Sequence, residues 1–214
     1  MQQNQFREPI DKLFECAAML AQAADAHMID DRETAATLIK STNLVEVREW
    51  LDSIWGKCSP YVLVRRIESA PRLLAKHERQ ETRMPSAAQK RQLHLRDGFH
   101  CRFCGIPVIR KEVRALLHKE YPSELPWGKT NATQHAAFQA LWTQYDHILP
   151  HARGGTNEMD NMVIACAACN FGRMNYTIEE VGLNDPRLRK PVKSNWNGLE
   201  HLLSKSAQIT LPES

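Results

Sequence analysis

The sequence lacks long apolar runs, a strong excess of either charge and any internal repeat. A membrane-spanning helix needs about 20 consecutive, mainly apolar residues, and no such run occurs. The opening residues, MQQNQFREPI, also lack the basic-then-apolar pattern of a secretory signal. These absences exclude a membrane-spanning protein, and we expect a cytoplasmic protein whose chain makes no membrane contact.

The formal net charge is only +3, and it is unevenly spread. Residues 1–85 hold 12 basic and 13 acidic side chains, whereas residues 86–214 hold 16 and 12. This bias is weak beside that of a basic DNA-binding domain, so charge alone does not establish a nucleic-acid partner. Charged residues make up 25% and hydrophobic residues 43%, which is the ordinary balance of a folded globular protein.

The first 85 residues show helical periodicity. One apolar stripe recurs at steps of three and four: Phe6, Ile10, Leu13, Ala17, Leu20 and Ala24. Aspartates at positions 30 and 31 predict the cap of a second helix, and the apolar spacing of residues 44–54 predicts a third, ended by Gly56. A fourth helix is expected to open at Ser59-Pro60. We therefore expect residues 1–85 to form a helical region that binds a partner or regulates the rest.

Residues 86–180 predict a second domain of mixed structure. Its first helix, over residues 86–97, is ended by Gly98. An insert at 106–144 contains two further helical patterns.

From Tyr145 onward the apolar residues shorten into two strand-like runs, 145–149 and 162–165, separated by a loop that contains Gly154-Gly155. A short helix after Cys169 completes a β-loop-β-α unit. Residues 181–214 read as a packed C-terminal extension. The predicted fold class is α+β, mainly helical.

Four of the six cysteines form two CxxC pairs, which are separated by 61 residues. In a reducing compartment such pairs favour a metal site over disulfides. Two pairs can supply four thiolates to one tetrahedral zinc ion, which leaves no open position for a reactive water. We therefore expect a closed, structural zinc site with these ligands: Cys101, Cys104, Cys166 and Cys169. The two lone cysteines, Cys16 and Cys58, are expected to be small core residues.

A second group of residues has the chemistry of phosphodiester hydrolysis, which needs a base for water and a cation against the phosphate. His147 titrates near neutrality and is the candidate general base. Asn161, from the facing strand, is expected to orient it. Asp146 and Asn170 offer the hard oxygen ligands that Mg²⁺ or a similar divalent ion prefers.

These residues resemble the motif of the HNH endonucleases, the ββα-metal nucleases. The resemblance spans roughly residues 90–176 and includes Tyr145-Asp-His-Ile-Leu-Pro-His-Ala-Arg-Gly-Gly-Thr-Asn157, Asp160-Asn161 and Cys166-Ala-Ala-Cys169-Asn170. It implies a zinc-stapled DNA endonuclease that uses one catalytic metal ion and nicks one strand per active site. The sequence departs from the family in its long insert and in carrying asparagine where the last motif position is often histidine.

Three side chains near the motif are candidate DNA contacts, namely Arg153, His151 and Arg173. Each could reach a phosphate, and the two in the loop could equally be solvated. Asn157 is interpreted as a turn former.

Two alternatives remain open at this point. The chain could be a zinc-ribbon DNA-binding module without nuclease activity, or an adaptor whose N-terminal helices carry the main function. For a nuclease, the helical front and the long insert resemble an accessory protein of bacterial anti-phage defence, such as the nuclease subunit of type II Zorya systems. Its partners would then be DNA and other subunits of the defence system.

Overall fold

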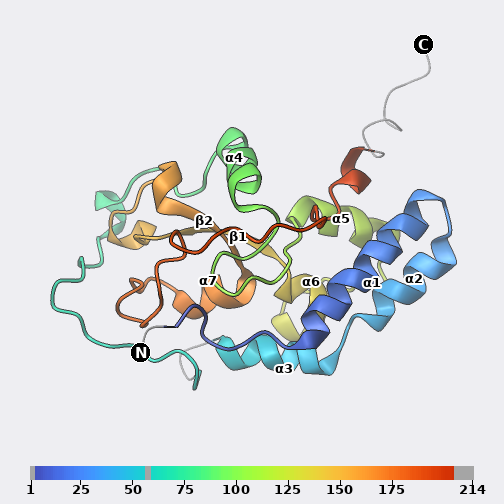
Figure 1. Cartoon of the computed structure of the whole chain (residues 1–214), viewed down its shortest axis with the longest axis horizontal. Helices are drawn as coiled ribbons and strands as arrows, with labels where there is room; N and C mark the ends of the chain where they lie inside the picture. Colours follow the sequence, from blue (N-terminus) through green and yellow to red (C-terminus); the bar gives the residue numbers. More distant parts are fainter. Residues whose placement is uncertain (1–2, 56–58, 205–214) are drawn as a thin grey trace, which may run out of the picture.

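A computed structural model of the chain describes residues 3–55 and 59–204, which form a mainly helical α+β fold (Figure 1). Its elements, in chain order, are α1 (Asp11–Met28), α2 (Arg32–Ser41), α3 (Val45–Ile54), α4 (Ala87–Asp97), α5 (Lys111–Glu120), α6 (Ala136–Ala140), β1 (Thr143–His147), β2 (Met162–Cys166) and α7 (Ala167–Arg173). Short 3-10 turns lie at Lys76–Glu78, Asn131–Thr133, His151–Arg153 and Met159–Asn161. The predicted fold class is confirmed.

The first three helices form where the apolar spacing predicts them. Leu13, Leu20 and Ala24 of α1 are fully buried, so the predicted apolar stripe of this helix is packed inside the protein. Asp31 caps α2, since its side chain accepts a hydrogen bond from the Thr34 backbone nitrogen at 3.1 Å. The predicted helix stop Gly56 and the expected core cysteine Cys58 lie outside the described residues.

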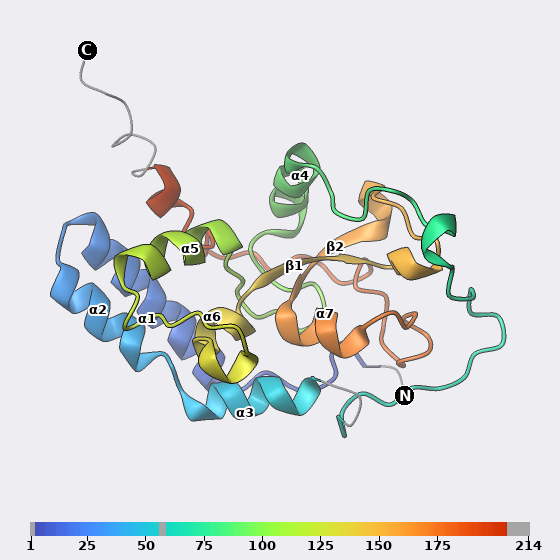
Figure 2. The same cartoon turned by 180° about the vertical axis from the view of Figure 1, so that it is seen from behind.

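The prediction of a fourth helix opening at Ser59-Pro60 is wrong. Residues 59–85, which we call the strap, are mainly extended, with short turns that include the one at Lys76–Glu78, and they run around one end of the molecule before α4 (Figures 1 and 2). Apart from these turns, the backbone of the strap bonds other segments: Arg65 nitrogen donates to Glu180 oxygen at 2.7 Å, and Leu74 nitrogen to Ala152 oxygen at 2.8 Å. These long-range bonds replace the local ladder that a helix would need.

The two strands form an antiparallel pair in which Thr143 faces Cys166 and His147 faces Met162. Helix α4 lies on one side of this pair and α7 on the other, as both views show (Figures 1 and 2). The loop from 148 to 161 connects the strands. The strand ends, this loop and α7 therefore bring the residues of the predicted motif together.

One hydrophobic core runs through the N-terminal helices and the sheet region. At Gly172 in α7, an added Cβ would lie 2.9 Å from the Ile54 side chain, so the helix of the motif sits directly on α3. Trp55 Nε1 also donates to the Ala167 carbonyl at 3.2 Å. Residues on the two sides of the expected division at residue 85 thus pack against each other.

The segment after α7 packs against the first CxxC turn. Trp196 Nε1 donates to Val108 oxygen at 3.1 Å, and the Arg189 guanidinium donates to Phe103 oxygen. In the ranges that the structure describes, no helix is long and apolar enough to cross a membrane.

Candidate active site and metal centre

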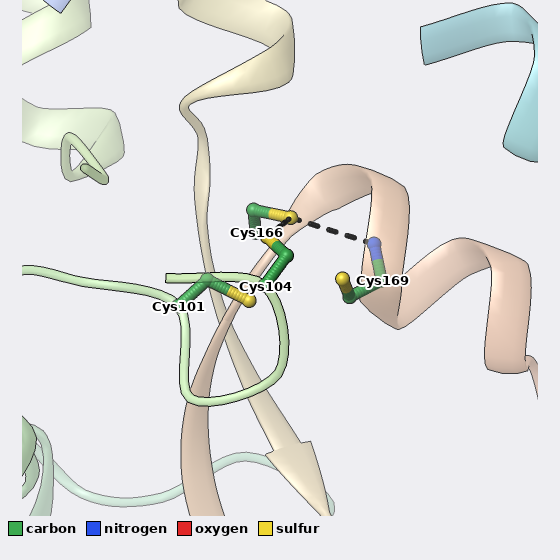
Figure 3. A group of neighbouring side chains, drawn as sticks. All are labelled: Cys101, Cys104, Cys166 and Cys169. Carbon is green, nitrogen blue, oxygen red and sulfur yellow. Dashed lines mark hydrogen bonds between the residues drawn. The ribbon is translucent and has the colours of Figure 1, made fainter. Parts of the chain in front are cut away.

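The four cysteines of the CxxC pairs meet in one buried cluster (Figure 3). Cys101 and Cys104 come from the turn after α4, whereas Cys166 and Cys169 come from the end of β2 and the start of α7. All four sulfur atoms lie within 4.8 Å of one another. The predicted grouping of these four residues is confirmed.

The spacing of the sulfur atoms fits a zinc ion. Four thiolates at about 2.3 Å from a tetrahedral zinc ion lie about 3.8 Å apart. The Sγ atoms of Cys104 and Cys166 are separated by 3.7 Å. Burial, reinforced by the neighbouring Cys101, raises the pKa of the Cys166 thiol well above its ordinary value, so four thiolates need a cation beside them. The cluster thus fits the expected structural zinc site.

Asp97 binds the first cysteine turn to the sheet, a role that no local sequence pattern indicates. Its fully buried carboxylate accepts from Arg102 Nη1 at 2.9 Å and from the Ile164 backbone nitrogen at 3.0 Å. Arg96 Nε donates to the same carboxylate at 2.7 Å. Bonds to an ionised acceptor are the stronger kind, so this group fixes the CxxC turn on β2.

Asp146 is buried beside Arg173. The guanidinium forms a bidentate pair with the carboxylate, with Arg173 Nε at 2.9 Å from Asp146 Oδ2. Its remaining donors reach the carbonyl oxygens of His147, Ile148 and Tyr176. Because the Arg173 side chain is only 1% exposed and its donors bind the chain, this residue holds the start of the motif in place, and the structure does not favour the predicted phosphate contact.

His147 is held by Asn157 rather than by Asn161. The ring Nε2 lies 2.8 Å from Asn157 Oδ1. The amide nitrogen of Asn157 donates to the carbonyls of Thr82 at 2.9 Å and Met84 at 3.2 Å, so its oxygen must face the ring. Nε2 therefore carries the proton and Nδ1 carries the lone pair.

The electrostatics of His147 keep its ring neutral. Burial lowers the pKa of His147 below its ordinary value, and the hydrogen bond that the ring donates to Asn157 and the charge of Asp146 oppose this only in part. A neutral ring with a fixed tautomer can accept a proton, which is what a general base requires.

Asn161 closes the loop between the strands. Its Oδ1 accepts from the Leu149 nitrogen at 2.8 Å, and its Nδ2 donates to Thr156 oxygen at 2.8 Å. The expected bond to His147 is absent from the described contacts of Asn161, so the prediction that it orients the ring is wrong. Gly155 lies next to Asn161, and a Cβ added at Gly155 would come within 1.7 Å of the Leu149 carbonyl oxygen.

Asn170 is the fourth residue of α7 and is half-buried, and its Nδ2 donates to Gln144 Oε1 at 3.3 Å. That bond leaves the amide oxygen for another partner, such as a metal ion. Asn170, Asp146 and His147 line one cavity of about 240 Å³, together with His151 and the strap residue Arg83. The structure thus brings the predicted base and both predicted oxygen ligands together.

The two loop candidates for DNA contact differ in their surroundings. Arg153 pairs with Glu180 at 2.9 Å and donates to the carbonyls of Asn175 and Pro71, with its side chain only 8% exposed. As a DNA contact it does not fit the structure, because its donors already bind the chain. His151 lies on the cavity wall with its ring centroid 5.9 Å from that of His147, and its Nε2 bonds Gln80 oxygen at 2.9 Å.

Comparison with known proteins finds the same motif. The model of the HNH endonuclease family matches residues 136–181, from α6 through both strands and α7. The comparisons with curated proteins and with solved structures give no match. The matched segment contains Asp146, His147, Asn161 and the second CxxC pair, and it supports a nuclease function. Residues 136–181 of this chain therefore match the HNH endonuclease family.

Proposed function

We propose that the protein is a metal-dependent endonuclease that hydrolyses phosphodiester bonds of DNA. The observation that carries this proposal is His147, whose neutral ring has an Nδ1 lone pair that no described residue occupies, in the same cavity as Asp146 and Asn170. A zinc-ribbon module that only binds DNA has no chemical need for this arrangement. The matched family supports the same chemistry.

In the proposed reaction, His147 Nδ1 takes a proton from the water that attacks the phosphorus, and Asn157 keeps the ring in the tautomer that permits this. The bond from phosphorus to one ester oxygen then breaks, and that oxygen leaves as a hydroxyl after taking a proton from solvent. Asp146 and Asn170 would hold a divalent ion such as Mg²⁺, which supplies positive charge against the phosphate. The pairing with Arg173 does not prevent ligation, because a carboxylate has about four lone-pair sites and Arg173 uses two of them. One such site serves one strand, so a monomer nicks duplex DNA.

The test uses supercoiled plasmid, Mg²⁺ and the full chain. We expect nicking by the wild type and none by His147→Ala at equal zinc content and equal far-UV circular dichroism. His77→Ala, an exposed histidine of the strap outside the cavity, is the matched control and should nick like the wild type. Equal nicking by all three proteins would show that His147 is not the base.

A role in bacterial anti-phage defence, with partner subunits like those of type II Zorya systems, stays a prediction from the resemblance of the helical front and the insert. It is tested by counting phage plaques on bacteria that express the chain with its neighbouring genes. Equal plaque numbers with the wild type and His147→Ala would argue against it.

A further inference from the structure

The active-site cavity continues into a second cavity. The second one, of about 190 Å³, lies towards the start of α5 and shares Met84, Gln144 and Tyr145 with the first. Because the same three side chains line both, the two cavities are neighbouring parts of one depression across β1. The residues of the proposed hydrolysis lie in only one part of it.

Three cations line this depression with neither a carboxylate nor a hydrogen-bond partner for their side chains among the described residues. Arg83 of the strap lines the first cavity, and Lys90 of α4 and Lys111 of α5 line the second. Other cations nearby are engaged: Arg79 donates twice to the Leu74 carbonyl, and Arg110 pairs with Glu200.

Structural contacts hold two of the free cations beside the motif. The carbonyls on either side of Arg83, those of Thr82 and Met84, accept from Asn157, so the backbone that carries Arg83 is tied to the catalytic loop. Lys90 Nζ lies 5.3 Å from the centre of the Tyr145 ring, one residue before Asp146.

The charge of the depression is not uniformly positive. The carboxylate of Glu112 lines the second cavity and approaches Arg110 to 3.8 Å. The free cations are divided between its two parts: Arg83 lines the first cavity, and Lys90 and Lys111 line the second. This arrangement suits a chain of separated negative charges better than a single anion.

We propose that the depression is the groove for the DNA backbone, with Arg83 holding a phosphate on one side of the cleaved bond and Lys90 and Lys111 holding phosphates on the other. The inference rests on the proposed nuclease function. It assigns phosphate contacts to the strap and to the first turns of α4 and α5, in place of Arg153 and Arg173, which bind the chain itself.

The groove is tested by binding alone, so that cleavage does not enter. Each variant, Arg83→Gln, Lys90→Gln or Lys111→Gln, is made in the zinc-loaded His147→Ala protein, and fluorescence anisotropy with labelled duplex DNA is measured in Ca²⁺ over a range of salt. Each lost contact should weaken binding several-fold and reduce the salt slope of log K by about 0.9. Lys40→Gln, an exposed lysine of α2, is the charge-matched control and should change neither.

Unchanged binding in all three groove variants would overturn the proposal, as would an equal loss with Lys40→Gln, because the effect would then report net charge only. Absence of DNA binding by the parent protein would overturn it too. In each of these cases, plasmid nicking by the wild type would leave the nuclease function standing, so the two failures are distinguishable.

Discussion

The buried pair of Asp146 and Arg173 gives the sharpest prediction for stability. Arg173→Met removes the bidentate pair and the bonds to three carbonyls, yet it leaves the Asp146 carboxylate, with 6% of its side chain exposed, without its counter-charge. Breaking a buried pair in this way costs about 3–5 kcal/mol of the free energy of unfolding. With a urea slope of about 2 kcal/mol per M, the midpoint should fall by about 2 M.

Urea unfolding followed by circular dichroism, at saturating zinc, measures this loss. The double variant Asp146→Asn/Arg173→Met should lose less unfolding free energy than the two single variants together, by about 1–3 kcal/mol, since no unpaired charge is left buried. Arg187→Met, which breaks the exposed pair with Asp185, is the control and should cost under about 1 kcal/mol. A loss below about 0.5 kcal/mol for Arg173→Met, or simple additivity in the double variant, would refute the reasoning.

Three further predictions concern the active site and the metal centre, and one concerns the buried His135. Asn157→Ala should lower kcat for plasmid nicking with little change in KM, because the tautomer of the His147 ring is no longer fixed. Asn157→Asp keeps the acceptor, so it should restore part of kcat and move the acid limb of the pH profile to higher pH. A pH profile identical to that of the wild type would contradict this. Gly155→Ala should abolish nicking, since its Cβ would lie 1.7 Å from a carbonyl oxygen, whereas Gly182→Ala, with no atom within 4 Å, should cost only the strain of a positive φ, as nicking assays and thermal melts would show. Burial lowers the pKa of His135 to about 4, so between about pH 6.5 and pH 4 the unfolded chain binds a proton at this residue that the folded chain does not. The free energy of unfolding should therefore decrease as the pH is lowered through this window. In urea titrations, His135→Asn should reduce the loss of stability between pH 7 and pH 5 by about 2 kcal/mol. Elemental analysis should find about one zinc ion per chain, lost in Cys166→Ser together with the near-UV signal of the folded protein; folded wild type without zinc would contradict the zinc assignment.

Local patterns predicted the parts of the fold that depend on neighbours in sequence. Residues close in sequence determine the geometry of three features: the CxxC turns, the cap at Asp31 and the capped helix from Ser86 to Gly98. The same holds for the adjacent Asp146 and His147. Such signals are readable because the bond that they predict spans one turn.

The rest depended on partners that are distant in sequence. Asn157 has the local properties of a turn former, and only the carbonyls of the strap, more than 70 residues away, turn its oxygen towards His147. Arg153 is similar, because its partner Glu180 belongs to a later segment. Ser59-Pro60 predicted the start of a helix, but Leu63, which would lie in its first turn, stays 68% exposed and has no helical packing face.

The strap also decides where this protein could be shortened. A fragment beginning at Ser86 keeps the four cysteines, both strands and α7, and by its motif it looks like a complete nuclease. It lacks the carbonyls of Thr82 and Met84, and with them the reason for Asn157 to present its oxygen to the ring of His147. An engineer seeking a minimal cutting module would thus keep the zinc centre and still lose the defined base, because the boundary of the catalytic unit lies upstream of the boundary of the motif.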